Sequence, residues 1–109
     1  MTSQVTASGP LIPAGWQRAM LGFLLLAELE DAPAHGYALA RNLEARGFSP
    51  VKGASLYPAL GKLEAEGLVS TSWEEGRGGP GRKVYEISAS GRVALGDYRG
   101  ALARLATLL

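Results

Sequence analysis

Cysteine is absent from this chain of 109 residues, and histidine occurs once, as His35. Without cysteine there is no disulfide frame, no thiolate nucleophile and no metal held by thiolates. A single histidine also excludes a zinc site made from several histidines of one chain. We therefore expect neither a metal nor a cofactor, and a chain without cysteine suits the reducing cytoplasm.

Long hydrophobic runs are also missing. The apolar stretch 19–27 is too short to cross a bilayer, which takes about 20 residues in a helix. This stretch lacks the basic start and the small-residue cleavage site that would mark a signal peptide. We expect no membrane contact and a cytoplasmic protein.

The charge of the chain is small, with a formal net value of +1, and does not by itself indicate a nucleic-acid partner. Its distribution is more informative. Arg77, Arg82 and Lys83 fall within residues 76–83, where no acidic residue occurs. A local basic loop of this kind can contact phosphates even when the whole protein is nearly neutral.

The stretch 53–67 has a clear helical pattern. Three leucines recur at spacings of four and three and therefore share one helix face: Leu56, Leu60 and Leu63. Charged side chains such as Glu64 lie off this stripe and should face water. Ser55 is the expected N-cap, and Pro58 then falls at the third helical position, where its missing N–H removes no hydrogen bond. Gly67 is expected to close the helix in a left-handed conformation.

The exposed side of this helix begins with small and hydroxyl-bearing residues, so its N-terminus can enter a DNA major groove. The alternative is an ordinary amphipathic helix of a small domain, because any such helix shows the same leucine stripe. The neighbouring segments distinguish these two interpretations.

The preceding segments complete a helix-turn-helix. Residues 1–13 read as a flexible arm, and a first helix is expected from about residue 15 to residue 30. The centre of that helix is apolar on every side, so it must be enclosed, more readily between two copies than within one small chain. A second helix is expected over 36–46, ended by Gly47, and residues 48–52 form the turn to the leucine-striped helix.

After Gly67 the period of the pattern changes from 3.6 to 2. Residues 68–75 and 83–88 read as strands, joined by a glycine-rich loop that must be an exposed turn. A helix-turn-helix followed by such a hairpin is a winged helix, with the arginines at the tip of the wing. The loop also matches the dinucleotide fingerprint G-x-G-x-x-G, but a strand rather than a helix follows it, and this excludes nucleotide binding.

The last helix is expected to begin after the N-cap Ser88 and to end near residue 108. Five large side chains in it follow coiled-coil spacing: Leu95, Tyr98, Leu102, Leu105 and Leu109. This seam indicates dimerisation, and the alternative is a helix that folds back on its own domain. The expected fold is mainly α with a β-hairpin wing: a winged helix-turn-helix domain over 14–88 and a C-terminal dimerisation helix over 89–109.

Nine residues are candidates for contacts with DNA phosphates or base edges: His35, Tyr37, Lys52, Ser55, Tyr57, Lys62, Arg77, Arg82 and Lys83. Each has a structural alternative. His35, with no obvious acid or second ligand nearby, can cap or hydrogen-bond at the start of the second helix. Ser55 can be a cap alone, and Tyr57 can pack its ring on the second helix.

A homodimer interface is expected between the first and last helices, from nine residues: Trp16, Met20, Phe23, Leu24, Leu95, Tyr98, Leu102, Leu105 and Leu109. If the protein has an effector, we expect a small hydrophobic molecule at this interface. Apolar and aromatic surface converges there around four of these residues: Trp16, Phe23, Tyr98 and Leu102.

Several motifs resemble the PadR family of bacterial transcriptional regulators over residues 18–100. They are His35-Gly36-Tyr37, Ser55-Leu56-Tyr57-Pro58-Ala59-Leu60, Leu63-Glu64, Glu66-Gly67-Leu68-Val69, Gly81-Arg82-Lys83-Val84-Tyr85 and Ser88-Ala89-Ser90-Gly91. Ser55 stands where threonine is more usual. Gly61 stands where a larger polar residue is common, which weakens the helix by up to about 1 kcal/mol. With a single C-terminal helix the chain is similar to the short subfamily.

The resemblance implies a homodimeric winged-helix repressor of a nearby operon, bound to double-stranded operator DNA. It also implies that the C-terminal helix packs against the partner's N-terminal helix, and that a hydrophobic small molecule can be the inducer. The alternative is a winged-helix adaptor between proteins that does not bind DNA, which the near-neutral charge and Gly61 would favour. An enzyme is a distant third, since the sequence has no recognisable nucleophile–base pair or carboxylate dyad.

Overall fold

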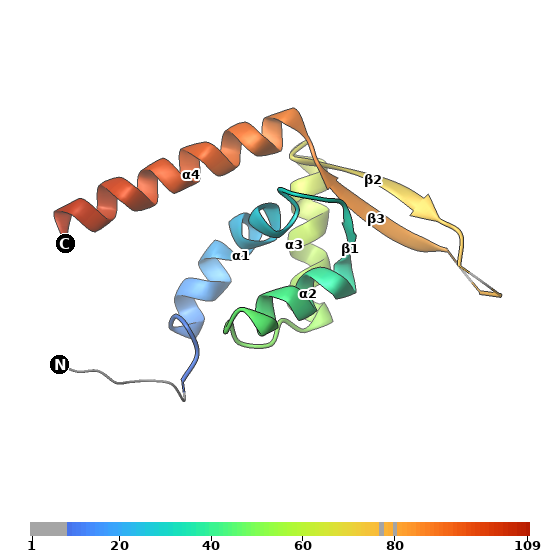
Figure 1. Ribbon diagram of the computed structural model, residues 1–109, viewed down its shortest axis with the longest axis horizontal. Coiled ribbons are helices and arrows are strands. Elements are labelled where there is room, and N and C mark those ends of the chain that lie inside the picture. The colour runs from blue at the N-terminus through green and yellow to red at the C-terminus, as the bar shows by residue number, and fades with distance from the viewer. Residues whose placement is uncertain (1–8, 77, 80) are drawn as a thin grey trace.

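The computed structural model describes residues 9–76, 78–79 and 81–109, and four helices and three strands follow one another within them (Figure 1). In chain order they are α1 (Ala14–Glu28), β1 (Ala34–His35), α2 (Gly36–Ala45), α3 (Gly53–Ala65), β2 (Val69–Glu74), β3 (Arg82–Ile87) and α4 (Ala89–Leu108). Helices α1, α2 and α3 form a body, the β2–β3 hairpin projects from one side, and α4 extends in the other direction. The predicted fold class, a mainly α winged helix-turn-helix followed by one helix, is confirmed. The division into an arm, a domain over 14–88 and a dimerisation helix over 89–109 stays a prediction.

The wing is the β2–β3 hairpin. It belongs to a three-stranded antiparallel sheet in which β3 lies between β1 and β2. The β2–β3 hairpin is the predicted one, in a register that pairs Val69 with Ile87 and Trp73 with Lys83. The sequence indicates only a turn where β1 lies. Two residues are too few to show an alternating pattern, and His35 is extended (φ −75°, ψ 153°) because it is the residue that precedes the first turn of α2.

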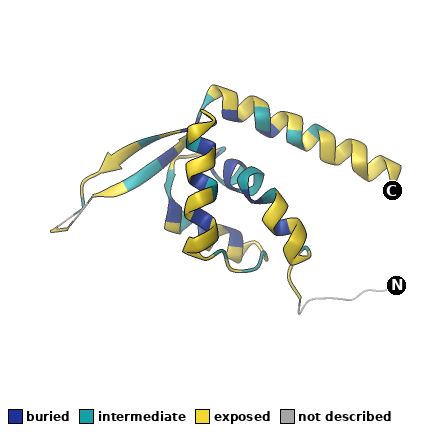
Figure 2. Ribbon diagram, turned by 180° about the vertical axis from the view of Figure 1, so that it is seen from behind, coloured by how far each residue is buried: buried dark blue, intermediate teal, exposed yellow. Residues whose placement is uncertain are grey.

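Leucines of the three body helices make the core (Figure 2). Six of them are almost completely inaccessible to solvent: Leu25, Leu26, Leu29, Leu39, Leu43 and Leu60. The sheet and α4 close the core with Val69, Tyr85, Ile87 and Leu95. Burial of each large side chain contributes about 1.5–3 kcal/mol. The leucine stripe predicted for residues 53–67 is confirmed as the buried face of α3.

Helix α1 is only half enclosed by its own chain. The buried residues of this helix are Gln17, Leu21, Leu25 and Leu26. Phe23 and Leu24 are half-buried and pack against the core, whereas Trp16 is 61% exposed on the outer side. The described chain therefore covers the inner face of α1 and leaves apolar side chains uncovered on the outer face.

The start of α3 differs from the prediction. The helix begins at Gly53, and the N-cap is Lys52, whose backbone is extended (φ −84°, ψ 159°) and whose side chain makes no capping bond. Ser55 is therefore not the cap but lies inside the first turn, where its N–H donates to the Lys52 carbonyl. Pro58 consequently lies inside the helix, beyond the first turn, and cannot donate to the carbonyl of Ala54. At the other end Gly67 has φ 73°, as predicted for a left-handed cap.

The start of α4 is joined to the base of the wing. Ser88 is the N-cap, as predicted, because its Oγ accepts the Gly91 N–H at 3.0 Å. The same hydroxyl donates to the Gly67 carbonyl at 2.6 Å, and the Ser88 N–H donates to the Leu68 carbonyl. Gly91 is buried, and a Cβ at this position would overlap the carbonyl oxygen of Leu68. The first turn of α4 thus lies directly against the end of the α3–β2 connection.

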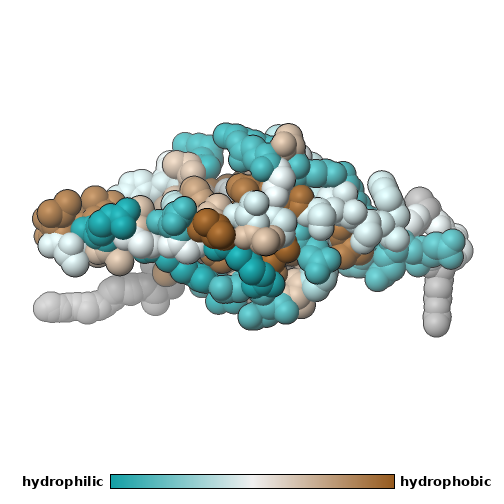
Figure 3. Space-filling view, turned by 90° about the horizontal axis from the view of Figure 1, so that it is seen from above, coloured by the Kyte–Doolittle hydropathy of each residue, from teal (hydrophilic) through white to brown (hydrophobic). Residues whose placement is uncertain are grey.

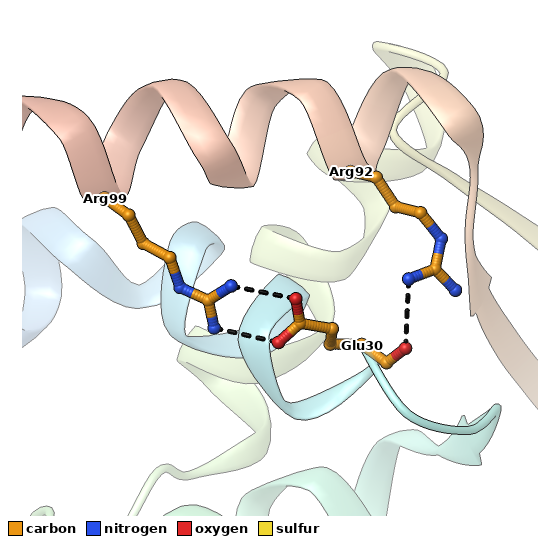
Figure 4. A network of polar contacts seen from close by, with 3 residues as sticks. All are labelled: Glu30, Arg92 and Arg99. Atoms are coloured by element: carbon orange, nitrogen blue, oxygen red, sulfur yellow. Dashed lines mark hydrogen bonds and ion pairs between the residues drawn. The ribbon is translucent and has the colours of Figure 1, made fainter.

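Two polar contacts and one aromatic stack hold the first half of α4 to α1 and its C-terminal turn (Figure 4). Arg99 donates to both carboxylate oxygens of Glu30 at 2.8 and 2.9 Å. Arg92 donates to the backbone carbonyl of the same residue at 3.1 Å. The rings of Phe23 and Tyr98 are stacked, with centroids 3.5 Å apart. These contacts fix where α4 leaves the body.

The second half of α4 has a different environment, since every residue from 101 to 109 is exposed. Hydrophobic side chains gather at this end of the molecule, and burial decreases along the helix (Figures 2 and 3). Leu95, predicted as part of a dimer seam, is instead 2% exposed and belongs to the core of its own chain. It lies where α4 crosses the body, whereas Leu102, Leu105 and Leu109 lie beyond the body. No helix in the described part of the chain is long and apolar enough to span a membrane.

Candidate nucleic-acid interface

Tyr57 lies on the flank of α3 that faces the wing and the start of α2. Its side chain is 52% exposed, and its ring packs across Gly36, the first residue of α2. A Cβ at Gly36 would lie only 2.9 Å from a ring carbon of Tyr57. The absence of a side chain at Gly36 therefore lets this ring lie against α2 while its outer part stays accessible. The two roles considered for Tyr57, packing and outward contact, are geometrically compatible.

A hollow of about 500 Å³ opens beside Tyr57, between α2, α3 and β3. Five of the nine candidate DNA-contacting residues line it: His35, Tyr37, Tyr57, Arg82 and Lys83. They come from three separate segments of the chain. Their spacing and charge in the sequence therefore do not indicate that they are neighbours in space. These five residues supply two phenol hydroxyls, an imidazole and two cationic groups, all of which can donate hydrogen bonds to phosphate oxygens.

His35 occupies the N-cap position of α2, but its side chain does not cap the helix. Its Nε2 lies 3.3 Å from Oε1 of Glu74 on β2. Its Nδ1 is buried and has no hydrogen-bond partner among the described residues. Of the two structural alternatives for His35, capping is wrong. An acid also lies nearby, contrary to expectation, because the pairing of β1 with β3 brings His35 next to a carboxylate that is remote in sequence.

Lys83 and Glu64 are bonded to each other rather than free. The Lys83 ammonium donates to Oε1 of Glu64 at 3.0 Å, and the Thr71 hydroxyl donates to Oε2 at 2.9 Å. The hydrogen bond from Lys83 lowers the pKa of Glu64, and the same bond raises the pKa of Lys83. Glu64 thus does not simply face water, as the sequence suggested. This bond joins the wing to α3 and uses one of the three N–H groups of Lys83, so a phosphate contact would depend on the other two.

The remaining candidates lie elsewhere on the surface. Ser55 and Lys62 line a second hollow of about 380 Å³ between α1 and α3, on the opposite flank of α3 from Tyr57. Lys52 is exposed at the start of α3. Arg77 lies outside the described residues. The structure therefore separates the candidates into a group beside the wing and a group beside α1.

Arg41 is a cationic side chain at this surface that the sequence reasoning missed. It is exposed on α2, and its guanidinium carbon lies 5.7 Å from the centroid of the Tyr37 ring. Together with Tyr37 and Tyr57 it lines a hollow of about 730 Å³ between α2 and the start of α3. The spacing of four residues from Tyr37, one helical turn, was the signal that could have identified it.

The PadR-like family of transcriptional regulators matches residues 25–97 of the chain. A transcriptional regulator of Mycobacterium tuberculosis is 37% identical over 91 residues, which cover 84% of this chain and 83% of that protein. A PadR family regulator from Eggerthella lenta superposes with a TM-score of 0.78 at 32% identity, over 85% of this chain and 80% of the other.

A second solved structure has DNA bound. The PadR protein of Bacillus subtilis, solved in complex with operator DNA, superposes with a TM-score of 0.67 at 25% identity. The match covers 72% of this chain and 45% of that protein. The family match, the mycobacterial relative and the shared architecture agree, and the chain belongs to the PadR-like family of transcriptional regulators.

Proposed function

We propose that this transcriptional regulator binds a pseudo-palindromic DNA operator as a homodimer and represses transcription from it. In this proposal α3 enters the major groove and the wing follows the sugar-phosphate backbone towards the adjacent minor groove. The observation that carries the proposal is the gathering of hydrogen-bond donors from α2, α3 and β3 around one hollow beside α3.

The exposed side of α3 supports close approach to DNA. The residues that face away from the core there are small, and a Cβ added at Gly61 would meet no atom within 4 Å. A helix with such a face can lie deep in a groove, while Tyr57 reaches base edges or phosphates from its flank. Arg82 is exposed on β3, and a phosphate contact there would add affinity for any sequence.

The homodimer is proposed from the uncovered apolar surfaces. The last part of α4 exposes Leu102, Leu105 and Leu109, and the outer face of α1 exposes Trp16. Contact between α4 of one protomer and α1 of its partner would cover both surfaces. A two-fold dimer would present two α3 helices about 34 Å apart, one turn of DNA, as a palindromic site requires.

The same region is the proposed site of a small hydrophobic effector. Trp16 is largely exposed, and the stacked rings of Phe23 and Tyr98 lie between α1 and α4. The Tyr98 hydroxyl is buried without a hydrogen-bond partner among the described residues, and burial raises its pKa. A bound phenol or carboxylate could accept its proton in a hydrogen bond. Crystals soaked with aromatic acids test this, and density only at another place would contradict it.

Mobility shifts on specific and random DNA at fixed salt test the main proposal. We expect Arg82→Ala to weaken binding to both DNAs and to reduce the slope of log affinity against log salt by about 1. We expect Tyr57→Ala to weaken specific binding more than random binding. Arg104→Ala, which makes the same change in charge on α4, is the control and should leave both affinities unchanged. Unaltered affinity in both test variants would refute the proposed interface.

A protein–protein adaptor is the second candidate, favoured by the small net charge. The two candidates differ in a simple measurement. An adaptor would show no salt-dependent affinity for random duplex DNA, whereas the proposed regulator must show it because phosphate contacts release counterions.

A further inference from the structure

Gln17 makes a pair of hydrogen bonds that the proposed DNA contacts do not explain. Its Nε2 donates to the Ser49 carbonyl at 2.8 Å, and its Oε1 accepts the Ser49 N–H at 2.9 Å. Among the residues that the structure describes, Gln17 is the only polar one in the buried class, at 8% exposure. One side-chain amide of α1 thus satisfies both backbone groups of one residue in the loop between α2 and α3.

This loop decides where α3 begins. Ser49 lies four positions before Gly53, and the N-cap Lys52 gives the helix no side-chain capping bond. The first turn of α3 is therefore not fixed by a cap of its own. A nearby backbone bond, from Leu11 to Gly47, ties the segment before α1 to the end of α2. The stretch 47–49 is held from the α1 side at two points.

The flank of α1 next to Gln17 carries part of the surface proposed above for the partner and the effector. Trp16 precedes Gln17 and is exposed, and Met20 lies one turn beyond Trp16 and is half-buried. A short α-helix is stiff, so a displacement imposed at Trp16 also displaces the side chain of Gln17. On α1 the proposed interface therefore lies next to the side chain that holds the loop before α3.

We infer that Gln17 is a positioning residue, through which the placement of α1 by the partner or by an effector sets the position of the first turn of α3. Operator affinity then depends on a contact that touches neither DNA nor effector. This inference rests on the proposed function. Helix α1 would thereby couple the proposed partner and effector surface to the proposed DNA-binding surface.

Three variants separate this role from simple stabilisation. Gln17→Met keeps the length and removes both hydrogen bonds, whereas Gln17→Glu keeps the acceptor for the Ser49 N–H and loses the donor. Ser49→Ala is the matched control, because only the backbone of Ser49 takes part in the contact. For each variant, hydrogen exchange of the residue 49 amide, affinity for operator and random DNA, and urea unfolding are measured.

For Gln17→Met we expect exchange of the Ser49 amide and the operator dissociation constant each to rise roughly tenfold, the usual consequence of losing such bonds. Affinity for random DNA should not change. Gln17→Glu should keep the amide protected and lose part of the operator affinity, and Ser49→Ala should behave like the original chain. If Gln17→Met does not fold, Gln17→Glu carries the test through its ratio of operator to random affinity.

A variant with faster exchange at Ser49 but an unchanged ratio of operator to random affinity would overturn the inference. An original chain without DNA affinity would instead refute the proposed function, and the exchange of Ser49 would still report on the contact.

Combination of Gln17→Met with Leu102→Asp and Leu105→Asp tests whether the partner surface acts on α3 through Gln17. If the partner acts through Gln17, the fold-loss of operator affinity in the combined variant is smaller than the product of the fold-losses caused by the Gln17 change and by the leucine changes alone. A combined fold-loss equal to that product would overturn the inference.

Discussion

The two halves of α4 belong to one regular helix but have opposite environments. In the first half, Leu95 is 2% exposed and Arg99 is bonded to Glu30. In the second half, Leu102 is 40% exposed and Leu109 is 93% exposed, although both continue the same spacing of apolar residues. A coiled-coil spacing therefore identifies the apolar side of a helix but not the chain that covers it. The first half is part of the domain, and the second half is the part that a partner can cover.

The largest effect should come from charges on the exposed half. We expect Leu102→Asp combined with Leu105→Asp to produce monomers, because an interface cannot bury unpaired carboxylates. Operator affinity should fall roughly 100-fold through the loss of the second half-site contact. Sedimentation velocity and DNA binding measure the two effects. Arg104→Asp, on the other side of the helix from Leu102, should leave assembly intact, and a dimer that persists in the double variant would remove the distinction between the halves.

The next largest effect is expected from Leu95→Ala in the anchored half. Truncation of a fully buried leucine typically lowers the free energy of unfolding by about 2–5 kcal/mol. Urea unfolding at several protein concentrations measures it. The loss should appear equally at all concentrations, since the side chain lies within one chain. A change confined to the concentration dependence would mean that Leu95 contributes to assembly after all.

Gly96→Ala is expected to have a smaller effect and to stabilise the fold. A Cβ there would meet nothing within 4 Å, so Gly96→Ala should raise the free energy of unfolding by about 0.5–1 kcal/mol through helix propensity alone. Thermal melts provide the measurement. Gly91→Ala is the matched comparison in the same helix and should be strongly destabilising, because its methyl group would overlap the Leu68 carbonyl.

The smallest effect concerns the ion pair that holds α4 to Glu30. The hydrogen bond from Arg99 lowers the pKa of Glu30 from its usual value of 4.5. The pair therefore stabilises the fold above that pH, and its contribution is lost as the pH falls through the lowered pKa. Glu30→Gln should melt slightly lower than the original chain near pH 7. The difference should shrink as the pH falls below 4.5 and Glu30 becomes protonated, and a gap that stays constant with pH would assign the effect to packing rather than charge.

The features predicted correctly from the sequence are those fixed by local signals. The stripe of α3, the left-handed Gly67 and the cap at Ser88 each depend on residues within one or two turns. The predicted start of α3 is wrong for a physical reason. A serine near a helix start is a good cap, but the extended backbone at Lys52 lets the helix begin before Ser55.

Pairs of polar residues far apart in sequence could not be predicted. Gln17 with Ser49 and Glu64 with Lys83 show no periodicity, because each contact depends on how whole elements pack. The hollow beside Tyr57 has the same origin. The chemistry of each side chain predicts five of its lining residues as DNA contacts, but their meeting at one place depends on the pairing of β1 with β3 and on the packing of α2 against α3.

Gly91 determines how closely α4 lies against the base of the wing. Because Gly91 has no side chain, the first turn of α4 lies directly against the Leu68 carbonyl, and Ser88 bonds to the same connection, so we expect α4 and the base of the hairpin to move together. In the proposed dimer, the span between the two DNA-reading helices is then set by this rigid joint. The spacing that matches the protein to the pitch of its operator would then depend on the absence of a side chain at Gly91.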